Sequence, residues 1–457
     1  MKVVNILKNI LNSKIQQSQK AETPVQITFV GEQTEYDKMK GCVVQPDAAK
    51  PDSPFHVEDF FPYYSYEGEK TEGIIPVTNY HSDAVMCDIS KLRISNDELL
   101  NLRINSSTIM SDEQKELLLK YQEKMKDPGL GIRNLHEQGI TGKGVKLAII
   151  DQPLSPHQEY NDRIIHNEDI NCRKMGMHNA QMHGASVASI AVGKDIGVAP
   201  DADLVYFSAW QNTKDPQYVE KYKENLQRIL NDPDSNWNTE YIKQKLTDIE
   251  NGKQIQTNKP YTDAINRILE LNKKLPDNEQ ISIISVSWEF DHLAPDYSEV
   301  MQTILKAQEQ GVFVLSTNVA QTHGIKFNGA DRNPFEDVNK PDSYQAGAFW
   351  KDGSEDVNGY FSSKKDETLL IPMDHRTVAD FDGNDKYRYE GNEGGMSWAT
   401  PYLAGVYVLA KQVKPDINPQ EFYKIALETS DECHNNDTGT YVGRLLNPLR
   451  LIDTLKN

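Results

Sequence analysis

Residues 142–151, with the sequence GKGVKLAIID, decide the fold class of this 457-residue chain. The apolar run 145–150 is short and lies between a glycine and an aspartate, so it predicts a buried strand. Three similar runs predict further strands: 204–207, 281–286 and 312–315. Helical patterns lie between the runs, such as 299–310, which ends at Gly311. Strands that alternate with helices indicate an α/β fold whose parallel sheet is covered on both faces.

Working outward from this stretch, the sequence divides near residue 127. The spacing predicts a helix over 111–126, which Ser111 can cap and a Pro-Gly pair would end. We therefore expect an N-terminal extension over 1–127, either an accessory domain or a pro-segment, followed by an α/β domain over 128–457.

Residues 211–260 interrupt the alternation of strands and helices. Helical spacing recurs over 216–230 and 238–250, and both stretches carry charges of both signs. We expect a solvent-facing helical insertion in this part of the α/β domain.

The composition excludes several classes of protein. The chain has 49 Lys and Arg against 68 Asp and Glu, a formal net charge of −19, whereas phosphate binding needs a basic surface. We therefore expect no nucleic-acid partner. Apolar residues make up 38% of the chain, enough for a sizeable core. The sequence has no uninterrupted apolar run of about 18 residues, so no transmembrane helix is expected.

The N-terminus and the cysteines bear on location. Residues 1–20 carry four lysines, no acid and apolar residues at helical spacing, and no small-residue cleavage site follows. They predict a short amphipathic helix rather than a secretion signal. The four cysteines are far apart and form no CxxC pair: Cys42, Cys87, Cys172 and Cys433. Free thiols in a cytoplasmic protein are the expectation that follows.

Two stretches carry a carboxylate and an imidazole in places suited to chemistry. Asp151 ends the first buried strand, where a half-buried carboxylate can orient a histidine; the alternative is an aspartate that caps the next turn. His183 begins HGASVASIAVG (183–193), whose small residues let a helix pack closely; the alternative is a structural histidine. Neither residue decides a function by itself.

A third stretch, GGMSWATPYLAGVYVLA (394–410), carries a serine. Ser397 would lie at the N-terminus of a nearly all-apolar helix, where backbone N–H groups and the helix dipole stabilise developing negative charge. Pro401 within the first helical turns is unusual. A generic buried helix would not need Ser-Trp-Ala-Thr-Pro at its start, so the stretch points to chemistry at Ser397.

The order Asp151, His183, Ser397, with glycines before the serine, resembles the subtilase family of serine peptidases. Four further segments are similar to segments of that family: SPHQEY (155–160), GVAPDADLVYFSA (197–209), ISVSW (284–288) and GYFSS (359–363). The resemblance covers about residues 130–457. It implies a three-layer α/β/α fold with a mostly parallel central sheet, and a serine endopeptidase that acts on polypeptide substrates.

The resemblance also implies a role for each of the three residues. A serine hydroxyl is a poor nucleophile until a histidine takes its proton, and an aspartate holds that imidazole in the right tautomer. Ser397 would be the nucleophile of an acyl-enzyme mechanism, His183 the general base and acid, and Asp151 the residue that orients it. The alternative is a catalytically silent subtilase fold used for binding or signalling. The intact trio favours the enzyme.

The chain departs from the family at the oxyanion hole, which keeps the silent alternative open. Relatives supply an asparagine from an Ala-Ala-Gly-Asn segment after a strand, and 311–324 lacks Gly-Asn. Asn318 is the nearest match, two residues early, and Asn328 is second. The alternative is that Asn318 is only a turn residue at the end of a strand.

By resemblance, Ser287, Trp288 and Glu289 form one wall of the pocket for the residue before the cut, with 315–318 opposite. Relatives commonly place glycine where Glu289 stands. Glu289 either lines the pocket and favours Lys or Arg there, or points to solvent while Trp288 shapes the pocket. Peptides would lie extended against 284–288, as in strand addition.

No metal ligands are predicted, and the expected chemistry requires no cofactor. His178 and His183 are five residues apart, which does not match the H-E-x-x-H zinc helix. Relatives often bind a structural calcium ion, but no residues of this sequence are assigned to such a site.

Overall fold

The computed structural model describes residues 55–56, 87–91, 94–175, 180–233, 235, 237–317, 319–347, 362–392, 395–435 and 439–456. The amphipathic helix expected over 1–20 lies outside the described residues, as do Cys42, His178 and Asn318. Two short strands, β1 (Phe55–His56) and β2 (Cys87–Asp88), pair in parallel. Cys172 and Cys433 are buried free thiols.

A five-stranded parallel sheet forms the centre, in the order β4-β5-β3-β8-β9. Its strands are β3 (Lys146–Asp151), β4 (Ile164–Asp169), β5 (Asp203–Ser208), β8 (Ile281–Val286) and β9 (Phe313–Ser316). Four of them are the strands expected from the apolar runs, with each end displaced by at most one residue. The edge strand β4 was not expected, because four of the six residues of its sequence IIHNED are polar.

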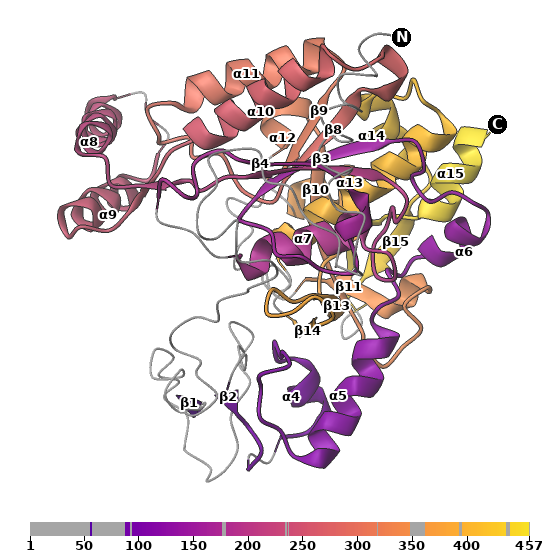
Figure 1. Cartoon of the computed structure of the whole chain (residues 1–457). Coiled ribbons are helices and arrows are strands. Elements are labelled where there is room, and N and C mark those ends of the chain that lie inside the picture. Colours follow the sequence, from indigo (N-terminus) through magenta and orange to yellow (C-terminus); the bar gives the residue numbers. More distant parts are fainter. Residues whose placement is uncertain are drawn as a thin grey trace, which may run out of the picture.

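Helices cover both faces of this sheet, which confirms the three-layer α/β/α class (Figure 1). On one face, Ala148 and Ile150 of β3 pack with α10 (Lys259–Asn272) and α11 (Tyr297–Glu309). On the other face, Leu147 and Ile149 pack with α7 and α13, which run over Met182–Val192 and Met396–Val413. Because both faces are buried, β3 reads as a continuous apolar run rather than an alternating one.

A second five-stranded sheet, in the order β11-β10-β12-β16-β15, lies on the far side of α13. Its inner strands are parallel and both edge strands are antiparallel. The strands are β10 (Lys326–Arg332), β11 (Tyr344–Ala346), β12 (Thr368–Pro372), β15 (Asp431–His434) and β16 (Tyr441–Leu445). The remaining helices of this half are α6 (Ile132–Glu137), α12 (Ala320–His323), α14 (Pro419–Glu428) and α15 (Pro448–Lys456).

Residues before 127 pack against a hairpin of β13 (Arg376–Ala379) and β14 (Tyr387–Glu390). Two helices are described in this segment, α4 (Asn96–Leu100) and α5 (Asp112–Lys124). Ser111 caps α5 as expected, by accepting a hydrogen bond from the backbone N–H of Gln114. The division of the chain at residue 127 stays a prediction.

Helices α8 (Pro216–Asn231) and α9 (Thr239–Glu250) lie where helical spacing predicts them, and they project to one side in Figure 1. Just before α8 and just after α9, the chain forms a short antiparallel pair of strands, β6 (Asn212–Thr213) and β7 (Ile255–Gln256). Within the described residues, no helix combines the length and the apolar character needed to cross a bilayer.

Candidate active site

The structure brings Asp151 and His183 into direct contact. Asp151 is the last residue of β3, and its side chain is only 4% exposed. Its Oδ1 accepts hydrogen bonds from the Gln152 backbone N–H at 2.8 Å and from His183 Nδ1 at 2.7 Å. The carboxylate therefore fixes the imidazole with its proton on Nδ1, which leaves Nε2 as the basic nitrogen.

Gly184 explains how the first turn of α7 comes so close to the end of β3. A Cβ at this position would lie 2.5 Å from the carbonyl oxygen of Gln152 and 2.6 Å from the hydroxyl of Tyr206. Any side chain here would therefore push α7, and His183 with it, away from Asp151. The glycine directly after the histidine is a requirement of the Asp151–His183 contact.

Ser397 is the second residue of α13, and the structure places it against Ser287, just beyond the end of β8. The Ser397 hydroxyl donates to the Ser287 carbonyl oxygen at 3.3 Å, and the Ser287 hydroxyl donates to the Ser397 carbonyl oxygen at 2.9 Å. Pro401 explains the second bond: it has no N–H, so the carbonyl four residues earlier lacks its helical partner. Ser287 supplies the missing donor.

Trp398 connects the serine to the histidine. Its ring centroid lies 5.1 Å from that of His183, with 34° between the ring planes. The indole of Trp398 is buried. The imidazole of His183 thus contacts α13 through this indole and bonds to Asp151 through Nδ1. From the sequence, Trp398 is assigned no role of its own. An aromatic residue next to the serine was the signal that could have identified it.

Of the two asparagines considered for the oxyanion hole, Asn318 lies outside the described residues. Asn328 lies in β10, 1% exposed, and its Oδ1 accepts from the Gly329 backbone N–H at 2.8 Å. Its amide nitrogen is buried without a hydrogen-bond partner among the described residues. Asn328 is therefore a buried donor with an unused proton.

The proposed pocket wall follows directly after β8. The backbone N–H of Thr317 donates to the Trp288 carbonyl oxygen at 3.3 Å, which joins the ends of β8 and β9. The Glu289 side chain is 58% exposed, and its Oε1 lies 3.2 Å from His292 Nε2. That hydrogen bond raises the pKa of His292, against the opposing effect of burial. Trp288 is half-buried against the core on the α10 and α11 face.

Among the residues that the structure describes, no group of three or more His, Cys, Asp or Glu side chains could hold a metal ion.

Comparison with known proteins finds a family that part of this chain resembles. The model of the Subtilase family matches residues 142–346, a range that contains Asp151, His183 and Ser287 but not Ser397. This part of the chain is similar to the Subtilase family.

Individual relatives are distant. Serine protease AprX of Bacillus subtilis (strain 168) is 22% identical over 338 residues, which cover 66% of this chain and 65% of AprX. The match thus spans less than two thirds of that relative's length. The prenylagaramide maturation protease PagA is 16% identical with a TM-score of 0.42, over 71% of this chain and 98% of that one. The PatG macrocyclase in complex with peptide is 13% identical with a TM-score of 0.42, over 72% and 96%.

Proposed function

We propose that the chain is a serine endopeptidase with Ser397 as nucleophile, His183 as general base and acid, and Asp151 as the residue that orients His183. The observation that carries the proposal is the 2.7 Å hydrogen bond between His183 Nδ1 and Asp151 Oδ1 at the end of a central parallel strand. Ligand sites of open α/β sheets lie at this end.

The proposed reaction begins with a rotation of the Ser397 hydroxyl. Its bond to the Ser287 carbonyl is long, at 3.3 Å, and therefore weak. Turned toward Nε2 of His183, the hydroxyl gives up its proton as its oxygen attacks the peptide carbonyl. His183 then protonates the leaving amine, which forms the acyl-enzyme, and water activated by the same histidine releases the acid.

The polypeptide substrate would lie beyond the sheet rather than along β8. Residues 283–286 of β8 pair with β9 on one side, and 283–285 pair with β3 on the other. A substrate therefore cannot pair with this part of β8. Of the expected contact residues 284–288, only those after the paired stretch are left to bind it. Ser287, Trp288 and Glu289, which follow the paired stretch, are the residues proposed to receive the substrate backbone.

A catalytically silent fold used for binding is the second proposal. It is favoured by the acceptor of the Ser397 hydroxyl, which is the Ser287 carbonyl rather than the His183 imidazole. The two proposals differ in reactivity, because a silent fold has no activated serine.

Labelling with a serine-directed phosphonate decides between them. We expect the full-length wild type to be labelled at Ser397, as read by peptide mass spectrometry, and Ser397→Ala to be unlabelled. Peptide hydrolysis should fall by roughly 10⁶-fold in kcat in Ser397→Ala, a magnitude taken from subtilisin. An unlabelled wild type, or a Ser397→Ala protein that still hydrolyses peptides at near wild-type rate, would overturn the assignment.

A further inference from the structure

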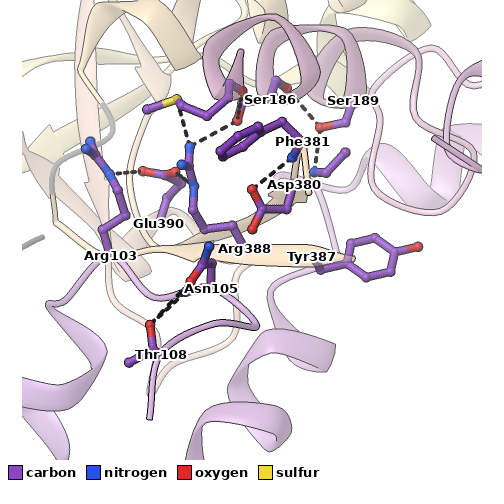
Figure 2. Close-up of polar contacts among 12 residues, drawn as sticks. Arg103, Asn105, Thr108, Ser186, Ser189, Asp380, Phe381, Tyr387, Arg388 and Glu390 are labelled. Carbon is purple, nitrogen blue, oxygen red and sulfur yellow. Dashed lines mark hydrogen bonds and ion pairs between the residues drawn. The ribbon is translucent and has the colours of Figure 1, made fainter. Parts of the chain in front are cut away.

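A buried chain of charged side chains connects the N-terminal segment to the helix that carries His183 (Figure 2). Arg388 and Glu390 lie two residues apart on β14 and are 2% and 0% exposed. Their Nε and Oε1 atoms are 2.5 Å apart, and the other Glu390 oxygen accepts from Arg103 Nε at 2.8 Å. Glu390 therefore lies between two guanidinium groups, one from each side.

The other end of the Arg388 guanidinium holds α7. Its Nη2 donates to Met182 Sδ at 2.9 Å and to Ser186 Oγ at 3.3 Å. Figure 2 shows the contact between Arg388 and Ser186. Met182 directly precedes His183, and Ser186 lies one turn after it. The Arg388 guanidinium thus bonds to the first turn of α7 at one residue before His183 and at one residue after it.

The hairpin is joined to α7 a second time, one turn further on. The backbone N–H of Ala379 in β13 donates to Ser189 Oγ at 3.0 Å, and the Ser189 hydroxyl donates to the Ser186 carbonyl at 2.8 Å. Both joints use small hydroxyl side chains, so the hairpin approaches the helix closely.

A buried ion pair is by itself weak evidence for a stabilising role. Removing two charges from water carries a desolvation penalty that their mutual attraction often does not offset. Replacing a buried ion pair by well-packed apolar side chains of similar volume is therefore often neutral or stabilising. Burial alone would raise the pKa of Glu390, but Arg103 and Arg388 outweigh it and hold that pKa below its ordinary value. The carboxylate stays charged and fixes the direction of the Arg388 fork.

We propose that Arg388 is a positioning residue for His183, held in place by Glu390 and, through Glu390, by Arg103 of the N-terminal segment. The proposal rests on the peptidase function proposed above and adds the residues that hold its general base. It also implies that the segment around Arg103 is required for activity, as an accessory domain would be, and is not a pro-segment that is removed.

The backbone fixes Arg103 independently of its charge. Ile104 pairs with Tyr389 of β14 through two hydrogen bonds, of 2.9 and 2.8 Å. Gly391, just after β14, has no room for a Cβ, because the backbone carbonyl carbon of Asn101 would lie 2.3 Å from it. The segment therefore forms an antiparallel β-bridge with the hairpin, which places Arg103 beside Glu390.

The test compares Arg388→Lys, Glu390→Gln and Arg103→Gln with the matched control Arg332→Lys in the full-length chain. A lysine at 388 keeps the charge but cannot serve Glu390, Met182 and Ser186 together. Arg332 is another fully buried arginine, but it donates to the backbone carbonyls of Asp127 and Pro128 rather than to α7. Arg103→Gln keeps the test open if a change at the buried centre prevents folding, because Arg103 is partly exposed.

Two readouts separate positioning from folding. We expect kcat to fall by about 10-fold or more in the three network variants with KM within about twofold, since small displacements of a base cost rate rather than binding. The proton on His183 Nδ1, assigned by its loss in His183→Gln, should shift or broaden in the one-dimensional NMR spectrum. Arg332→Lys should lower the melting temperature but keep both kcat and this proton signal.

Unchanged kcat and an unchanged Nδ1 proton in all three network variants would overturn the positioning role. Equal losses in Arg332→Lys would also overturn it, because they would show a general loss of stability. If the wild type neither hydrolyses peptides nor reacts with the phosphonate, the peptidase function fails. The proton signal would still decide whether Arg388 positions His183.

Discussion

Ser287 and Ser397 exchange hydrogen bonds across two elements 110 residues apart in sequence, each hydroxyl donating to the other residue's backbone carbonyl. The exchange depends on Pro401, which leaves the Ser397 carbonyl without its helical donor. The nucleophile proposed here is therefore held by a residue that also borders the proposed substrate pocket.

Ser287→Ala should both destabilise the chain and slow the reaction. It leaves the Ser397 carbonyl without a donor, which costs about 1–3 kcal/mol of unfolding free energy. The start of α13 loses a restraint, so kcat should fall more than KM rises. Urea unfolding and steady-state kinetics measure the two effects.

Ser285→Ala is the matched control, because Ser285 lies buried in β8, two residues before Ser287, and its hydroxyl has no partner among the described residues. We expect its unfolding free energy to stay the same or rise slightly. Equal destabilisation by both substitutions would show that the bond to Ser397 contributes nothing.

Asn318→Ala should lower kcat by roughly 10²–10³-fold if its amide binds the developing oxyanion. KM should change little, because that contact forms mainly in the transition state. Asn328→Ala should then leave kcat within a few-fold. The reverse pattern would assign the role to Asn328, whose buried amide proton lacks an acceptor in the described part of the chain.

The preference for Lys over Leu before the cut should rise with pH. Below its raised pKa, His292 is protonated and neutralises Glu289; above it, the Glu289 charge is free to attract a basic residue. The attraction at 4 Å amounts to about 1 kcal/mol or more. Measuring kcat/KM for a matched Lys and Leu peptide pair across neutral pH tests this.

Glu289→Gln should abolish that pH dependence, and His292→Gln should give the full preference at every pH across the neutral range. If Glu289→Gln keeps the wild-type ratio between the Lys and Leu peptides, Glu289 takes no part in selection and Trp288 shapes the pocket instead.

His323 should make the fold sensitive to acid. Its ring packs edge-on to Phe313 at 4.7 Å, accepts from Gln308 and is 8% exposed, and burial lowers its pKa from 6.5 to about 4. The unfolded chain therefore binds a proton that the folded chain rejects. Stability from this group is complete above about pH 6.5 and is lost as the pH falls toward 4, by about 3 kcal/mol in all.

His323→Gln should flatten the pH dependence of the unfolding free energy over that window, as measured by urea titrations at several pH values. His434→Gln is the control, because this histidine is 44% exposed. A His323→Gln curve parallel to that of the wild type would exclude His323 as the source of acid sensitivity.

The sequence predicts the central sheet well because β3, β5, β8 and β9 are buried on both faces and show as apolar runs. Local motifs also predict contact between Asp151 and His183, which the structure shows, whereas the role of Ser397 stays a prediction. The second sheet is not predictable in this way, since its strand β10 reads KFNGADR and two of its four polar side chains, those of Asn328 and Arg332, are nevertheless buried. Strand β14, YRYE, is equally hard to predict. Its Glu390 is buried as a charged group because it pairs with Arg103, which lies 287 residues earlier in the sequence.

The pairing of Ile104 with Tyr389 has a consequence for the order in which the chain is made. The ribosome synthesises the helix that carries His183 long before the hairpin of β13 and β14. Arg103 can pair with Glu390 only after the 287 residues that separate them have been synthesised. Contacts of such long range form slowly and late. Unfinished chains that end before β14 therefore lack the hydrogen bonds that Arg388 makes to Met182 and Ser186, on either side of His183 in the sequence.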